Sequence, residues 1–361
     1  MPWYLKQYLP QLCAAVDRAP SIFNQRPWEL ELAADERVEL YSVPNEALAS
    51  AGLVREAVIS CGAALYNLRL AISVAGRHPA VSLLPGLDQG SGLLDAVTGE
   101  RTLLASVEVM PGRAAQPTDA AQELYEALWL RRTDRGPYRY MPVPPPILVE
   151  MEIAAAHERG WLRTLSPAES KRAMRAAVKA SRELGKGFAA GLSAVPEDAY
   201  GPTPDNEEEP PTRPDFWLPQ TVVRFERHPV MMALSTDDDR PLDWLRAGQA
   251  LQHALLAGTR FSMSAPGGRS TPYRQELDYG PLNPRRLRLR PPVPAGYAVE
   301  ASFLTQSLEL ADQRHRVRNW PWQTSYTEVP QLVLRVGYAP VARGSGPGRP
   351  HIPPAQRPVG G

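Results

Sequence analysis

The stretch RAPSIFNQRPWELEL, residues 18–32, sets a polar turn directly against an alternating run of apolar residues. Pro20 and Ser21 open the turn, Asn24 lies inside it, and Trp28 follows a second proline where the run begins. Proline, serine and asparagine favour turns, whereas alternating apolar and polar side chains are typical of a half-buried strand. The sequence therefore predicts a polar turn packed tightly against strand-forming and aromatic residues, which is an arrangement suited to holding a ligand.

The residues on either side of this turn predict the elements that hold it. The run 28–43 alternates apolar and charged side chains on both sides of a break at 33–36. Two such runs joined by a short polar break pair as antiparallel strands, so we expect a β-hairpin. Before the turn, residues 3–18 carry apolar side chains at helical spacing and predict a helix.

The rest of the chain mixes helical and strand patterns without a regular alternation. Helical spacing and end signals predict helices at 45–76 (two, closed by Gly76), 117–132, 144–165, 166–185 and 241–260. Short apolar runs predict strands at 80–86, 230–236 and 330–340, and order resumes at 298–310 after a long irregular stretch. This mixture favours an α+β fold.

The composition argues against several classes of function. The chain has 40 basic and 39 acidic side chains in 361 residues, whereas a dedicated nucleic-acid binder usually carries a basic excess. Its 6 histidines are scattered without the spacing of metal ligands, and its 2 cysteines form no CxxC pair and fit a reducing compartment. The longest apolar helix candidate, 57–76, contains Asn67 and Arg69, so we expect no membrane span. Without a secretory signal either, a cytoplasmic protein is expected.

The segment LWLRRTDRGPY, at the end of the predicted helix 117–132, is the strongest candidate for an anion site. Arg131, Thr133 and Arg135 alternate, so in an extended segment their side chains project to one side. Two guanidinium groups and a hydroxyl suit a phosphate monoester, although a solvated surface cluster has the same composition. Two further arginine-rich runs, 285–291 and 314–320, fit charged edge strands better than an anion site.

Several motifs together resemble one known family. They are APSIFNQRPW (19–28), ISCGAALYNLRLA (59–71), RRTDRGPY (131–138), DWLRAGQAL (243–251), ASFLTQSLE (301–309) and PQLVLRVGY (330–338), in consistent order over nearly the whole chain. In these the chain resembles the nitroreductase-fold FMN oxidoreductases, and within them the Acg-like family of actinobacterial flavoproteins, in which two nitroreductase-like halves are fused in one chain. The resemblance implies that FMN lies between the halves, as it lies between the subunits of the homodimeric relatives.

The resemblance also assigns roles to single residues. Pro20, Ser21 and Asn24, with Arg26 where relatives carry glutamine, match the turn that contacts the flavin ring. Arg131, Thr133 and Arg135 match the segment that binds the flavin phosphate. Further contacts are implied toward the C-terminus, namely Ser302 and Gln306 in a loop near the ring and Arg357 over the phosphate. If Arg26 points at the ring, its charge is expected to raise the flavin potential.

The expected organisation is a pseudo-dimer with a first half at 1–115 and a second half at 116–361. The second half would contain an irregular insertion at about 261–297, expected to act as a lid or substrate surface, and a Pro/Gly/Arg tail at 340–361. The fused unit would act alone or as a homodimer.

The resemblance implies a function but leaves alternatives open. The first is an FMN-dependent oxidoreductase that takes electrons from NAD(P)H, or directly from a small-molecule or peptide-like substrate. No side chain is identified as a required acid or base. The second is a protein that sequesters FMN beneath a lid without turnover. The third is a partner-binding scaffold that has lost its flavin.

Overall fold

The computed structural model describes residues 5–33, 37–43, 54–86, 101–110, 118–133, 138, 141–170, 230–261, 297–303 and 328–340. Within them, the elements before residue 111 form what we call the first unit. Its helices are α1 (Leu5–Val16), the short 3-10 helix η1 (Ile22–Asn24) and α3 (Val54–Val74), and its strands are β1 (Trp28–Ala33), β2 (Arg37–Ser42), β3 (His78–Leu83) and β4 (Thr102–Met110). The strands form an antiparallel sheet in the order β1-β2-β4-β3.

The elements after residue 141 form the second unit. Its helices are α6 (Pro145–His157) and α9 (Pro241–Thr259), and its strands are β5 (Trp161–Thr164), β6 (Val230–Thr236), β7 (Tyr297–Phe303) and β8 (Val329–Pro340). These strands are also antiparallel, and their order β5-β6-β8-β7 repeats that of the first sheet. One further helix, α5 (Asp119–Leu130), lies in the chain between the two units and begins at the Thr118 cap, whose hydroxyl accepts a hydrogen bond from Ala121 N.

The predicted β-hairpin is confirmed. In β1 and β2, Leu30 lies opposite Leu40 and Leu32 lies opposite Val38, as the alternation requires. Val38 and Leu40 are fully buried, whereas the charged neighbours Arg37 and Glu39 are exposed and partly buried, respectively. The apolar face of the hairpin therefore anchors the turn that precedes β1 on the body of the first unit.

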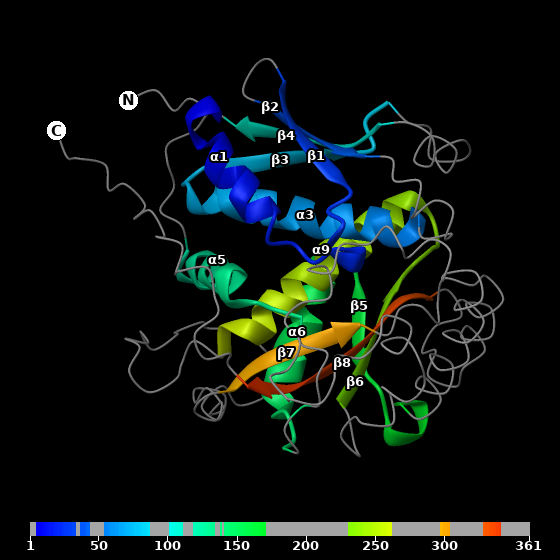
Figure 1. The fold of residues 1–361 in the computed structure, drawn as a ribbon. Coiled ribbons are helices and arrows are strands. Elements are labelled where there is room, and N and C mark those ends of the chain that lie inside the picture. The colour runs from blue at the N-terminus through cyan, green and yellow to red at the C-terminus, as the bar shows by residue number, and fades with distance from the viewer. Residues whose placement is uncertain are drawn as a thin grey trace, which may run out of the picture.

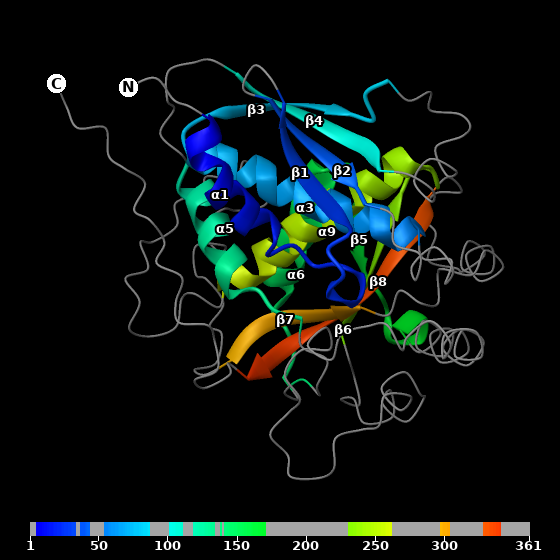
Figure 2. The ribbon, with the colours of Figure 1, turned by 45° about the horizontal axis from the view of Figure 1, so that its top comes forward.

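Helices α3 and α9 form the centre of the molecule, between the two sheets (Figure 1). The same arrangement is seen after a 45° rotation, with α3 facing the first sheet and α9 nearer the second (Figure 2). The two helices approach closely at Gly62 and Gly248, where a Cβ on Gly248 would lie 2.0 Å from the carbonyl oxygen of Ile59. Both helices carry the pattern G-x-A-L at this crossing, a short repeat that marks matching positions on α3 and α9.

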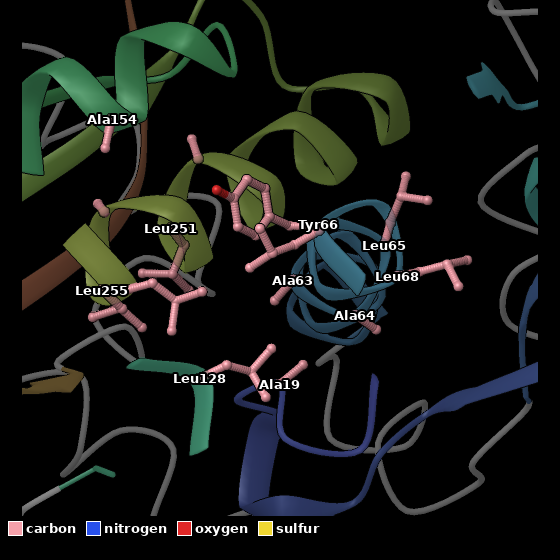
Figure 3. Packing of buried hydrophobic residues seen from close by; sticks show 14 of the residues in the cluster. Ala19, Ala63, Ala64, Leu65, Tyr66, Leu68, Leu128, Ala154, Leu251 and Leu255 are labelled. Atoms are coloured by element: carbon pink, nitrogen blue, oxygen red, sulfur yellow. The ribbon is translucent and has the colours of Figure 1, made fainter. Parts of the chain in front are cut away.

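The core continues from this crossing toward α1 and α5. Leu128 of α5 and Ala19, just after α1, lie beside each other below α3, and Leu251 and Leu255 of α9 face the same region (Figure 3). Helix α3 is long and apolar enough to cross a membrane, but 83% of its apolar stretch is buried inside the protein. Its apolar length therefore fits a core helix, and α9, predicted to be amphipathic, is likewise buried on nearly all sides.

The structure corrects three sequence expectations. The predicted helix 144–165 ends at His157, because Arg159 adopts a left-handed conformation (φ 61°) and Trp161–Thr164 pairs with β6 as strand β5. Strand β4 was not predicted at all. Helix 117–132 ends at Leu130, so the arginines that follow leave the helix in an extended conformation. The predicted helix before residue 54, most of helix 166–185, nearly all of the 261–297 insertion and the tail beyond residue 340 lie outside the described residues.

Candidate functional site

The turn between α1 and β1 is held in an uncommon backbone conformation. Asn24 and Arg26 both have positive φ angles, 55° and 47°, a left-handed region that residues other than glycine rarely adopt. Inside the turn, the Ser21 hydroxyl accepts a hydrogen bond from Arg26 N at 3.1 Å, and Asn24 N donates to the Ser21 carbonyl at 3.1 Å. Strained non-glycine residues that persist in a well-bonded loop are typical of functional sites.

Helix α3 supports this turn from beneath. Ile22 N donates to the Ser60 hydroxyl at 3.1 Å, and that hydroxyl donates in turn to the Glu56 carbonyl at 2.7 Å. From the next residue of α3, the Cys61 thiol donates to the Pro27 carbonyl at 3.1 Å. Burial raises the pKa of this thiol, so it stays protonated and remains a donor. The turn is therefore fixed to the central helix at both of its ends.

The segment with Arg131 and Thr133, which we call the arginine fork, lies directly beside the turn. From the end of α5, the Arg131 guanidinium donates to the Thr133 hydroxyl at 3.3 Å and to the Arg18 carbonyl at 3.2 Å. In the opposite direction, the Arg18 guanidinium donates to the Trp129 carbonyl of α5 at 3.0 Å and lies 5.9 Å from the centre of the Trp129 ring. This reciprocal pair of arginines joins two segments that are more than 100 positions apart in the chain.

Positive charge accumulates where the two segments meet. Burial lowers the pKa of Arg18, and the charges of Arg132 and Arg26 lower it further. Arg131 is half-buried next to this group, so four guanidinium groups share one region of the surface. Guanidinium groups match the oxygens of phosphate or carboxylate. The arrangement thus fits an anionic ligand.

The structure brings together most of the predicted site residues that it describes. Pro20, Ser21, Asn24 and Arg26 lie in the turn, with Asn24 and Arg26 exposed, and Arg131 and Thr133 lie in the fork. Arg18 was missed by sequence reasoning. A basic residue beyond the end of a helix is common, and only the distant contact with α5 distinguishes this one.

Of the remaining predicted residues, the structure describes only Ser302. Ser302 was expected in a loop but belongs to strand β7, where it is paired with Arg335 of β8. Arg135, Gln306 and Arg357 lie outside the described residues. Their proposed contacts with a cofactor stay predictions.

Tyr138 ties the segment after the fork to the second sheet. The Arg335 guanidinium lies 4.1 Å from the centre of the Tyr138 ring, a distance typical of a cation–π contact. A Cβ on Gly337 would lie 2.3 Å from the same ring, so only glycine leaves room for it. Tyr138 therefore packs closely against strand β8 of the second sheet.

Comparison with known proteins agrees with this arrangement. No family model matches the chain. Two curated proteins of Mycobacterium tuberculosis, named "Putative NAD(P)H nitroreductase Rv3131" and "Putative NAD(P)H nitroreductase MT3217", are each 28% identical over 341 residues, which covers 90% of this chain and 83% of theirs. The chain is therefore similar to these nitroreductase-like proteins over most of its length.

A further match covers a shorter part of the chain. "Putative NAD(P)H nitroreductase acg" of the same organism is 32% identical over 126 residues, 35% of this chain and 34% of its own length. Together with the longer matches, it supports the resemblance to the Acg-like proteins.

Proposed function

We propose that the chain is a cytoplasmic FMN-dependent oxidoreductase of the nitroreductase type. The observation that carries this proposal is the reciprocal contact of Arg18 and Arg131, which sets the strained turn beside the arginine fork. The names of the relatives add the reaction class, since each is named an NAD(P)H nitroreductase.

The residues present fit the two ends of FMN. Arg131 and Thr133, with the neighbouring charge of Arg18, would hold the phosphate through charge-assisted hydrogen bonds. Ser21 and Asn24 would lie toward the ring, held by their contacts within the turn and by the anchoring of the turn on α3. When bound, the flavin would supply hydride transfer between NAD(P)H and a small-molecule or peptide-like substrate.

Arg26 would tune the bound flavin. After burial and the charge of Arg132, the charge of Arg26 also lowers the pKa of Arg18, so Arg26 adds to the positive charge at the turn. A fixed positive charge near the ring would stabilise the negative charge gained on reduction and raise the midpoint potential. The variant Arg26→Gln is expected to lower that potential while FMN stays bound. An unchanged potential in this variant would rule out the role.

The pseudo-dimer is part of the same proposal. The two sheets repeat one strand order, and α3 and α9 cross at matching glycines, as two fused copies of one ancestral unit would do. We place the halves at 1–115 and 116–361. The proposed FMN site would then draw its turn from the first half and its fork from the second. The fused unit would act alone or as a homodimer.

The first experiment is the visible spectrum of the purified protein, followed by anaerobic addition of NADH and then NADPH. A flavin spectrum that a nucleotide bleaches supports the oxidoreductase. Flavin that only a chemical reductant bleaches would favour sequestration of FMN, or an enzyme reduced by its own substrate. A colourless protein that cannot be reconstituted with FMN would overturn the flavin proposal and favour a partner-binding scaffold.

A matched pair of variants tests the position of the phosphate. Arg131→Leu is expected to weaken FMN binding about 10- to 100-fold, because a hydrogen bond to a charged group contributes about 1.5–3 kcal/mol. Arg240→Leu serves as the control, since Arg240 is an exposed arginine paired with Asp238. Equal FMN affinity in the two variants, measured by fluorescence titration, would place the phosphate elsewhere.

A further inference from the structure

A cavity lies beside the N-terminal half of α5, at the opposite end of this helix from the fork. It has a volume of about 380 Å³ and is enclosed by α3, α5, α6, α9 and the start of β3. Thr118, Ala121 and Leu124, in the N-terminal half of α5, form one wall, whereas the fork comes after the C-terminal end of that helix. A volume of this size suits a small organic molecule.

The wall formed by α3, α6 and α9 carries a connected group of polar side chains. Glu158, just after α6, accepts a hydrogen bond from the Arg69 guanidinium at 2.5 Å. The other carboxylate oxygen of Glu158 lies 3.5 Å from His253 Nδ1. Arg69 also donates to the Gln249 side chain at 2.7 Å, and the His253 ring stacks on Tyr66 with 4.8 Å between the ring centres. Each polar group is thus held in place by a neighbour.

The charges that line the cavity favour an anion over a cation. Both carboxylates already have an arginine partner, Glu158 with Arg69 and Glu150 with Arg260. Three imidazoles remain, and each adds a positive charge when it is protonated. The titratable and charged side chains that face the cavity are Tyr66, Arg69, His78, Glu150, His157, Glu158, His253 and Arg260.

His253 is the imidazole most suited to respond to a ligand. Burial lowers its pKa, and the nearby charges of His157 and Arg69 lower it further against the opposing effect of Glu158. The ring is therefore largely neutral at neutral pH. An anion entering the cavity would supply the counter-charge that favours the protonated ring.

We propose that this cavity binds a small organic carboxylate with an apolar body, and that binding takes up one proton at His253. Arg69 and His253 hold the carboxylate group. Among the described residues, both side-chain hydrogen bonds of Arg69 use the same terminal nitrogen, which leaves its other N–H groups for the ligand. Leu70, Leu124 and Ala154 provide the apolar wall for its body. This carboxylate site is independent of the FMN site.

Benzoate is the test probe, and benzamide is its uncharged control. Binding to the purified protein is measured by titration calorimetry at about pH 6 and about pH 8, on either side of the ordinary histidine pKa. Benzoate is expected to bind at least about tenfold more tightly at the lower pH, because uptake of one proton changes affinity by up to tenfold per pH unit. Benzamide is expected to bind weakly and without this pH dependence.

Three variants locate the binding. Arg69→Leu and His253→Asn are expected to weaken benzoate binding, and His253→Asn is also expected to reduce its pH dependence. Asparagine is chosen because it already occupies the matching position of the other central helix. Asn67 follows Gly62 of α3 by five residues, and His253 follows Gly248 of α9 by five residues. Arg131→Leu is expected to leave benzoate binding unchanged. Binding that is lost in Arg131→Leu but kept in the other two would assign the anion to the fork and overturn the proposal.

A measurement on the unaltered protein covers the case in which these variants do not fold. The His253 ring is titrated by NMR with and without saturating benzoate. The proposal requires benzoate to raise the pKa of His253. An unchanged His253 titration, equal affinity for benzoate and benzamide, or no benzoate binding at either pH would each overturn it.

Discussion

The two units differ where their first helix leads into their first strand. In the first unit, residues 17–27 separate α1 from β1 and include two left-handed residues, Asn24 and Arg26. In the second unit, only residues 158–160 separate α6 from β5. Gly160 lies so close to α9 there that a Cβ would be 2.5 Å from the Ala250 side chain.

This difference shows how two units with matching sheets and central helices can carry different groups of charged residues. The sheets and the central helices of the two units match, so the frame alone does not create the cationic site. The long connection places Arg18 among other arginines, whereas the short one places Glu158 between Arg69 and His253. The two connections therefore bring different charged groups together, although the sheets and central helices around them match.

The largest expected effect tests the frame that the two units share. Gly248→Ala would set a Cβ 2.0 Å from the Ile59 carbonyl oxygen and 2.7 Å from the Gly62 Cα, both of them backbone atoms that cannot move aside cheaply. Overpacking of this kind is expected to lower the free energy of unfolding by about 3 kcal/mol or more. Chemical denaturation measures the change.

Gly86→Ala is the matched control for this substitution. Gly86 has a φ of 78°, and no atom of the described residues lies within 4 Å of an added Cβ, so it reports backbone strain without crowding. A cost of about 1–2 kcal/mol is expected there. If Gly248→Ala costs no more than Gly86→Ala, the close approach of α3 and α9 does not hold in solution.

The second effect separates the two connections. Arg26 and Arg159 are both left-handed arginines, one in each connection, with φ angles of 47° and 61°. Glycine at either position is expected to raise the free energy of unfolding by about 0.5–1 kcal/mol, because relief of strain outweighs the greater freedom of the unfolded chain. Only Arg26→Gly is expected to change the midpoint potential of bound FMN.

Potentiometric titration of the two variants decides whether this distinction is real. A change of the flavin potential in Arg159→Gly comparable to that in Arg26→Gly would show that the short connection also acts on the flavin. Destabilisation in both variants would instead show that the arginine side chains contribute more than the strain costs.

Much of the fold was predictable because its signals are local. The alternation around Leu30 and Leu40 specified the hairpin, and helical spacing indicated both central helices. Strand β5 was hidden, since its four residues continue a helical pattern and become a strand only by pairing with β6. Strand β4 carried a usable signal in the alternation of Val107 and Val109 with polar residues, which sequence reasoning overlooked.

The candidate site was predictable only in part, for a related reason. The turn and the fork each have a recognisable composition, so Asn24 and Arg131 could be named from the sequence. Arg18 could not, because its significance arises from a contact with Trp129, 111 positions away. The cavity beside His253 has no local signal at all, since its lining comes from five separate elements.

The smallest expected effect concerns the segment after the first strand in each unit. Three residues separate β1 from β2, whereas β5 is followed by the start of a helix that is capped by Ser166 and Glu169. The Glu169 carboxylate accepts from Ser166 N at 2.7 Å, and Ser166 N, the Ser166 hydroxyl and Arg163 together lower its pKa although burial opposes them. A carboxylate with a lowered pKa stabilises the fold above its unfolded value of about 4.5, and that contribution is lost as the pH falls through the folded value.

Glu169→Gln is therefore expected to change the stability by less than about 1 kcal/mol at neutral pH, because glutamine can also complete a capping box. Its loss of stability between about pH 5 and about pH 3 should be shallower than that of the unaltered protein. Glu108→Gln, an exposed change on β4, is the control, and thermal melting across this pH range is the measurement. If the stability of Glu169→Gln falls with decreasing pH as steeply as that of the control, the cap does not lower the pKa of Glu169 below its value in the unfolded chain.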